Sequence, residues 1–155
     1  MMVGALESAL EQAVRYAGER VQFGKPIGKN QVIQQNLALM AGDVAAARVA
    51  ALVAAADAPS VLSLAMQGDC SATPFSTAVA KVRAGEAATR GAGIVHQVHG
   101  AIGFTHEHPL HFATRRLWAW REEFGTDAMW AAELGRAAIT ARAAGFWPGV
   151  TRKQF

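Results

Sequence analysis

The spacing of apolar residues in long alanine-rich segments is the feature that most constrains the fold. Near the start of the chain, Leu6, Leu10, Ala13 and Ala17 recur three or four positions apart. This spacing places them on one face of an α-helix. Similar segments fill most of the sequence, and alanine favours helices over strands. The pattern therefore predicts an all-α protein.

Breaks at glycine and proline divide these segments into five predicted helices. The first runs from the N-terminus to about Arg20, and a turn at Phe23–Pro26 ends it because proline fixes φ. Asn30 is the expected N-cap of the second helix, which should end before Pro59. The others are predicted from residue 75 to 99, from 107 or 109 to 123, and from 127 to 145, with Thr73 and Pro74 starting the third.

These segments predict an up-down bundle of four to five helices over residues 1–145. Residues 59–73 should form a loop with one short helix at 61–66, and residues 146–155 an extended or mobile tail. The first helix begins without a capping residue, so we expect the chain to be cut from a longer polypeptide.

Composition limits the remaining classes. A chain of 155 residues with 52% apolar residues suits one domain, and its formal charge of +3 is too scattered to predict a nucleic-acid surface. No uncharged run is long enough to span a membrane and no leader pattern is present, so a cytoplasmic protein is expected. Cys70 is the only cysteine, which excludes an intrachain disulfide.

All five histidines fall between positions 96 and 111, where a metal site has to be considered. His96 and His99 could share a helix face, as could His108 and His111. A glycine-containing turn separates the two pairs, and no HExxH pattern is present. We therefore expect histidines at helix ends and interfaces, and no metal.

Arg20, Gln22 and Phe23 place a guanidinium, an amide and an aromatic ring at a predicted helix end. A guanidinium suits a pyrophosphate, and a flat apolar side chain suits a flavin or adenine ring. The same residues also suit a helix C-terminus with a core-filling phenylalanine, and taken alone they favour this structural interpretation.

Three blocks together resemble the C-terminal domain of acyl-CoA dehydrogenases. The first begins YAGERVQFGKPIGKNQ at Tyr16, the second is QVHGAIGF at residues 97–104 followed by Glu107 and Pro109, and the third is Gly125-Thr126. Their order and spacing match the family pattern over nearly the whole chain.

The resemblance implies an FAD-dependent protein that assembles as a dimer of dimers and desaturates an acyl-CoA. The first two blocks would contact FAD of a neighbouring subunit, and Thr126 the FAD of its own subunit. The expected cofactor-binding residues are Arg20, Gln22, Phe23, Asn30, Gln31, Gln97, Val98, His99, Gly100, Ala101 and Thr126.

The catalytic base departs from the family pattern. The resemblance places the usual glutamate at the position of Phe124, which cannot accept a proton. Glu123 is the candidate for a displaced base, while the alternative position on the first helix would precede Met1. About two-thirds of the family polypeptide is missing, so the chain alone is expected to be inactive.

The segment HEHPLH at 106–111 with Arg115-Arg116 resembles acyl-CoA dehydrogenases of steroid and ring-compound catabolism. Some of these combine catalytic and non-catalytic subunits. Two readings stay open: a component that shares FAD with a full-length acyl-CoA dehydrogenase subunit in a homo- or hetero-oligomer, and a non-catalytic assembly module.

Overall fold

The computed structural model describes residues 1–66 and 75–152, with the side chains at 60–62 and 64–65 left out, and it is an all-α fold with one small hairpin. In chain order the elements are α1 (Met2–Glu19), β1 (Val21–Gln22), β2 (Lys25–Pro26), the short 3-10 helix η1 (Ile27–Lys29), α2 (Gln31–Met66), α3 (Phe75–His99), η2 (Gly100–Phe104), α4 (Leu110–Glu122) and α5 (Asp127–Arg152).

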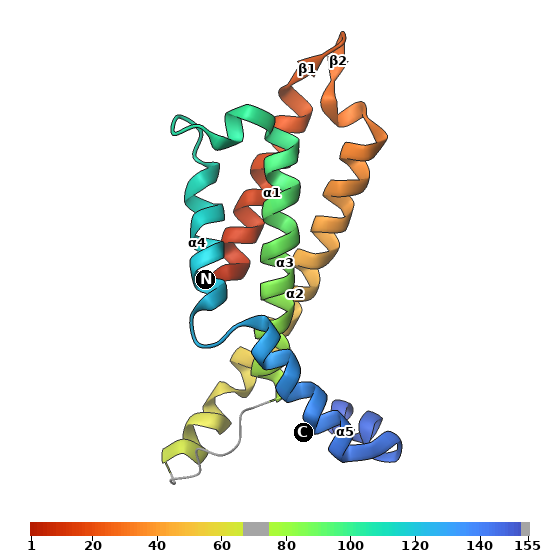
Figure 1. The fold of residues 1–155 in the computed structure, drawn as a ribbon, viewed down its shortest axis with the longest axis vertical. Helices are drawn as coiled ribbons and strands as arrows, with labels where there is room; N and C mark the ends of the chain where they lie inside the picture. Colours follow the sequence, from red (N-terminus) through yellow and green to blue (C-terminus); the bar gives the residue numbers. More distant parts are fainter. Residues whose placement is uncertain (67–74, 153–155) are drawn as a thin grey trace.

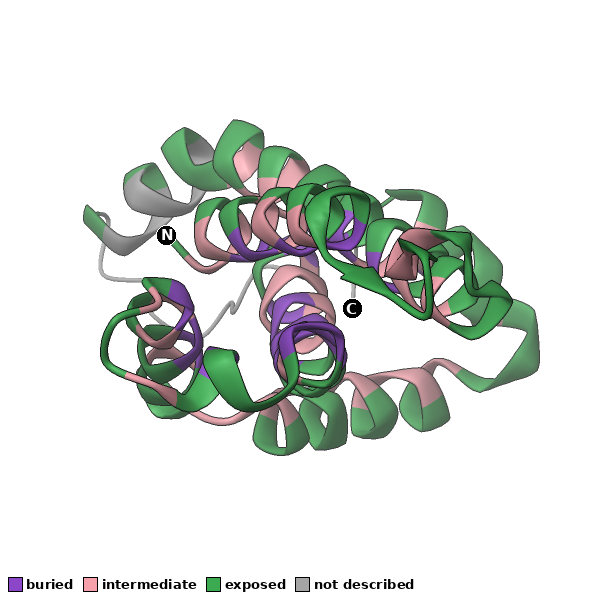
Figure 2. Ribbon diagram, turned by 90° about the horizontal axis from the view of Figure 1, so that it is seen from above, coloured by how far each residue is buried: buried purple, intermediate pink, exposed green. Residues whose placement is uncertain are grey.

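The helices form an up-down bundle around α3. In Figure 1, α1 to α4 alternate in direction, with the hairpin and η2 at one end, while α5 leaves the bundle at the other end. Seen from above, the buried residues lie mainly on the sides of the helices that face this central helix (Figure 2). The predicted all-α bundle is confirmed.

Small residues on α3 allow its neighbours to approach closely. A side chain on Gly91 would lie 3.1 Å from Leu6 Cδ2 on α1 and 3.2 Å from Met40 Cε on α2. Leu6 and Met40 are both fully buried, as are Leu110 and Leu117 on α4. The core is therefore filled by long side chains from the outer helices that reach an alanine- and glycine-rich central helix.

Most predicted helix boundaries are confirmed. The range of α3 agrees with the prediction, and the turn after Arg20 contains the short hairpin. Asn30 caps α2, because its Oδ1 accepts a hydrogen bond of 3.0 Å from the Val32 N–H. The predicted start of α3 at Thr73 and Pro74 lies outside the described residues.

Two boundary predictions are wrong. The second helix does not end at Pro59 but continues to Met66, absorbing the predicted short helix. Residues 146–152 are helical rather than extended, since α5 kinks at Arg142 and continues to Arg152. Packing explains the second error: Gly149 is buried, and Val150 lines a groove with residues of α2 and α3. The proposed division into a bundle and a tail remains a prediction.

The outer surface of α2 is unusually apolar. Its segment Gln31–Pro59 is long and apolar enough to cross a membrane by length and composition, with a mean hydropathy of 1.8, and 17% of that window is buried in the chain. The segment is nevertheless tied to the bundle, because Asp43 forms ion pairs with Arg83 and Arg90 of α3 at 3.5 and 3.2 Å.

A bidentate ion pair joins the start of α5 to the end of α4. Arg121 donates from Nε and Nη2 to the two oxygens of Asp127, at 3.2 and 3.1 Å. Gly85 on α3 leaves room for this contact, since a side chain there would lie 2.6 Å from Asp127 Cβ. The ion pair and its hydrogen bonds hold the pKa of Asp127 below its ordinary value of 3.8.

We expect Leu6→Ala to lower the free energy of unfolding by about 2–5 kcal/mol, because it leaves a cavity between α1, α2 and α3. Val14 on the same helix is 53% exposed, so Val14→Ala should change stability by less than about 0.5 kcal/mol. Urea unfolding followed by circular dichroism measures both. Equal effects of the two variants would contradict the described core.

We expect the Asp127 ion pair to stabilise the fold at neutral pH and to lose that contribution in acid. Its folded pKa lies below the unfolded value, so the stabilisation is complete above pH 3.8 and disappears as the pH falls through the folded pKa. The difference in unfolding free energy between the wild type and Asp127→Asn should therefore shrink as the pH is lowered. Arg121→Met should show the same pH dependence, and an additive double variant would argue against the pair.

Candidate cofactor-binding site

The hairpin after α1 fixes the backbone of Arg20. Its two-residue turn places Phe23 and Gly24 at φ values of 51° and 78°, the left-handed conformation that tight hairpin turns require. The Arg20 N–H donates to the Tyr16 carbonyl at 2.8 Å, and the Arg20 carbonyl accepts from the Ile27 N–H at 2.9 Å. Arg20 is therefore held at the base of the hairpin, next to the start of α2.

A cavity of about 500 Å³ lies between the hairpin base, the start of α2 and the junction of α3 with η2. Its lining residues are Tyr16, Arg20, Gln22, Ile27, Asn30, Ile33, Gln97, Val98, His99, Gly100, Ala101 and Ile102. Residues from the first and second sequence blocks thus meet in one cavity, although more than 60 positions separate them in the sequence.

The polar groups of the cavity suit an anionic, hydrogen-bonding ligand. Arg20 supplies a guanidinium, and Asn36 Nδ2 donates to Gln97 Oε1 at 3.3 Å, which leaves the amide hydrogens of Gln97 to serve as donors. Gly100 has a φ of 63°, and a side chain there would meet no atom within 4 Å, so the backbone is open on that side. This donor set fits the pyrophosphate and polar groups of FAD.

His99 forms the wall of the cavity rather than a charged contact. It is 3% exposed, and its Nδ1 lies 2.7 Å from the Val95 carbonyl, which makes Nδ1 the protonated nitrogen. Its ring stacks on Tyr16 at 4.7 Å and meets His108 edge-on at 4.6 Å. Burial lowers its pKa, so neutral His99 acts mainly as a packed aromatic ring.

Two predicted cofactor residues lie beside the cavity and do not line it. Phe23 is fully exposed at the hairpin tip, and Gln31 is an exposed residue at the start of α2. Only a ligand or partner that extends beyond the cavity would contact them.

The third block lies at the opposite end of the bundle, in the turn between α4 and α5. Lys81, which contacts this turn, and Val98 of the cavity are separated by 17 residues of α3, or about 25 Å at 1.5 Å per residue. The structure therefore separates Thr126, Glu123 and Phe124 from the other predicted site residues.

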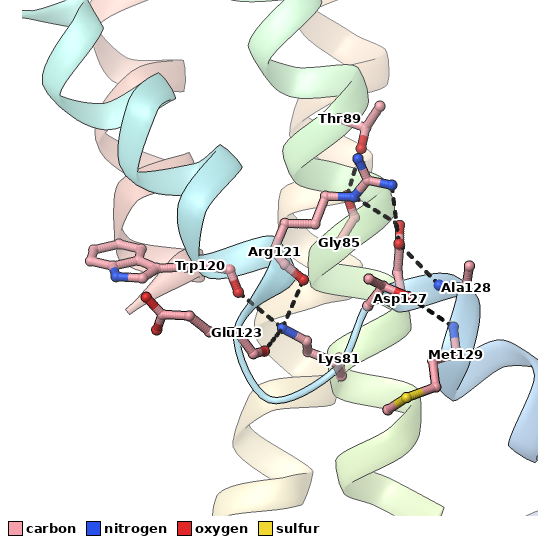
Figure 3. Close-up of polar contacts among 10 residues, drawn as sticks. Lys81, Gly85, Thr89, Trp120, Arg121, Glu123, Asp127, Ala128 and Met129 are labelled. Atoms are coloured by element: carbon pink, nitrogen blue, oxygen red, sulfur yellow. Dashed lines mark hydrogen bonds and ion pairs between the residues drawn. The ribbon is translucent and has the colours of Figure 1, made fainter.

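The turn itself exposes the residue at the expected base position. Phe124 has a φ of 58° and is 89% exposed, while Glu123 is an exposed residue in extended conformation. In Figure 3 the Glu123 carboxylate points away from Lys81, toward which its carbonyl oxygen is directed. Thr126 caps α5, since its Oγ1 accepts from the Met129 N–H at 3.1 Å.

Sequence reasoning missed Tyr16, Ile27, Ile33 and Ile102 as cavity residues. A signal existed for Tyr16, which lies four residues before Arg20 and therefore on the same face of α1. The three isoleucines had no such signal, because apolar residues in and beside helices are usually assigned to the core.

The histidines contact their own helix ends and neighbouring helices. His96 Nε2 lies 3.1 Å from Thr114 Oγ1, and His108 Nδ1 accepts from the Leu110 N–H at 3.2 Å. Within residues 1–66 and 75–152, no group of three or more His, Cys, Asp or Glu side chains is placed to hold a metal ion.

Comparison with known proteins gives consistent matches. Residues 1–139 match the family model of the acyl-CoA dehydrogenase C-terminal domain. The acyl-CoA dehydrogenase IpdE2 of Mycobacterium tuberculosis is 37% identical over 114 residues, which cover 74% of this chain and 31% of that protein.

Solved structures agree with this assignment. A glutaryl-coenzyme A dehydrogenase in complex with glutaryl-CoA superposes with a TM-score of 0.79 and 31% identity, covering 93% of this chain and 34% of that one. The ChsE4–ChsE5 complex from Mycobacterium tuberculosis gives a TM-score of 0.77 and 28% identity, covering 89% of this chain and 35% of that one.

The chain thus spans about a third of the length of these relatives. Fold and sequence both agree with the matched domain. This chain belongs to the acyl-CoA dehydrogenase family and corresponds to its C-terminal helical domain.

Proposed function

We propose that this chain forms one side of an FAD site and helps to assemble an acyl-CoA dehydrogenase. The observation that carries the proposal is the cavity in which Arg20, Asn30 and Gln97 converge from three separate segments. Members of this family use FAD, which accepts a hydride when an acyl-CoA is desaturated. The remainder of the flavin site and the acyl-CoA pocket would come from parts of the family polypeptide that this sequence does not include, such as those of a partner subunit.

Different cavity residues would contact different parts of FAD. Arg20 is placed to pair with the pyrophosphate, while Gln22 and Gln97 supply neutral donors. Gly100 and Ala101 give the backbone a smooth, open edge along the same wall. Phe23, exposed beside this wall, would pack on a part of the cofactor or of the partner subunit that lies outside the cavity.

The exposed face of α2 supports assembly with another subunit. Its exposed apolar residues are Val32, Leu39, Val49 and Leu52, each more than half exposed. An apolar helix face of this kind is covered when subunits associate. We propose a full-length acyl-CoA dehydrogenase subunit as the partner, in a homo- or hetero-oligomer that is cytoplasmic and binds neither nucleic acid nor membrane.

Phe124 favours the second candidate function, a non-catalytic subunit. A phenyl ring cannot remove the α-proton of an acyl-CoA, so this chain would contribute flavin contacts while a partner supplies the base. The displaced-base alternative assigns that role to Glu123, whose carboxylate is exposed in the same turn.

We expect Arg20→Ala to weaken FAD retention by about tenfold to a hundredfold, the effect of losing a charge-assisted hydrogen bond. The measurement is flavin absorbance and FAD affinity of the chain, purified alone and co-expressed with a subunit that carries the β-barrel domain. Arg15 is exposed on the same helix and does not line the cavity, so Arg15→Ala is the matched control. A colourless assembly, or equal retention by both variants, would refute the proposed site.

Glu123→Gln tests the displaced base. In the assembled enzyme, the exchange of the acyl-CoA α-proton with solvent deuterium should fall by at least about a hundredfold if Glu123 removes that proton. Glu122→Gln, which alters the neighbouring exposed carboxylate, should leave the exchange unchanged. If both variants exchange at the wild-type rate, Glu123 is not the base and the non-catalytic function is favoured.

A further inference from the structure

The end of α4 is capped by a side chain from another helix. Lys81 of α3 directs its ammonium group at three carbonyl oxygens, those of Trp120, Arg121 and Glu123, at 2.9, 3.0 and 2.6 Å (Figure 3). A helix leaves its last carbonyls without partners, and most helices satisfy them locally or with water. Here the three donors of one ammonium group match three acceptors, which requires the charged form of the lysine.

Further contacts hold the rest of the turn from the α5 side. The Trp130 indole N–H donates to the Phe124 carbonyl at 3.0 Å, and the Arg121–Asp127 ion pair joins the helices on either side of the turn. Together with the Lys81 contacts, these bonds engage the carbonyls of both Glu123 and Phe124. The backbone of the turn is therefore held from both α3 and α5.

The conformation that results is a costly one for Phe124. A residue other than glycine is disfavoured at positive φ. Phe124 has a φ of 58°, and its phenyl ring is 89% exposed. Burial of the phenyl ring therefore offsets little of this cost. Charge-assisted hydrogen bonds such as those from Lys81 are stronger than bonds between neutral groups and can offset this cost.

We propose that Lys81 is a positioning residue, which fixes the end of α4 so that the side chain at position 124 projects outward. The inference rests on the proposed function for its meaning, because position 124 is where the family base is expected. The turn would then retain the geometry that presents a base, although the chain carries phenylalanine there. Lys81 itself does not transfer protons, since all three of its hydrogens are engaged by carbonyl oxygens.

The test is nuclear magnetic resonance of the ¹⁵N-labelled full chain, with the Trp130 indole N–H as a reporter of the turn. Lys81→Met should shift this resonance and accelerate its hydrogen exchange by about tenfold or more, since the opening free energy falls by at least one charge-assisted hydrogen bond. Lys81→Arg, which keeps the charge and several donors, should restore most of the protection. Trp130→Phe removes the indole, so the resonance that disappears in this variant is that of the Trp130 N–H.

Lys25→Met is the control, because Lys25 is exposed in the hairpin at the other end of the bundle. A folded Lys81→Met chain with an unchanged Trp130 signal would overturn the proposal, as would equal acceleration of exchange throughout α1 and α3. If Lys81→Met fails to fold, Lys81→Gln and Lys81→Arg are compared instead. The Trp130 indole N–H should then exchange faster in Lys81→Gln than in Lys81→Arg.

Flavin and substrate are absent from this experiment, so its outcome is separate from that of the proposed function. If FAD retention does not depend on Arg20, but the Trp130 signal does depend on Lys81, the proposed function is refuted and the positioning role stands. The opposite combination would refute the positioning role alone.

Discussion

The close approach of α1 and α2 to α3 is the constraint on which the rest of the structure depends. Gly91 of α3 lies against Leu6 and Met40, whose side-chain ends would be 3.1 and 3.2 Å from an added Cβ, closer than ordinary van der Waals contact. Dispersion and burial act only at such short range, so the lack of a side chain on one helix lets two long side chains from other helices fill the core. In the same way, the absence of a side chain on Gly85 leaves room for Asp127 at the start of α5.

Because α3 is central, it also sets the distance between the cavity and the turn between α4 and α5. Its last turn contributes Gln97 and Val98 to the cavity, while Lys81 in its second turn reaches the turn between α4 and α5. A helix of this length keeps the two regions about 25 Å apart.

The cavity and the turn between α4 and α5 both carry groups that lie open to solvent. The cavity offers donors along one side, Phe23 projects beyond it, and α2 exposes an apolar face. Exposed apolar groups cost free energy in water and are stabilised where another surface covers them. Phe124 is also exposed, and its left-handed backbone is held by hydrogen bonds to the carbonyls of the turn rather than by contacts of its ring.

The sequence alone determined the helical class, the N-cap at Asn30, the limits of α3 and the two blocks that form the cavity, because these depend on local spacing and on short motifs. It could not determine that α2 continues through Pro59. It also could not determine that residues 146–152 are helical, since packing at Gly149 and Val150 overrode the usual effect of proline and glycine there. Nor could it indicate that Lys81 caps α4, or that Arg121 and Asp127 close the turn. Those contacts join residues on different helices, and only the tertiary structure, which sets the distance between the helices, decides that they form.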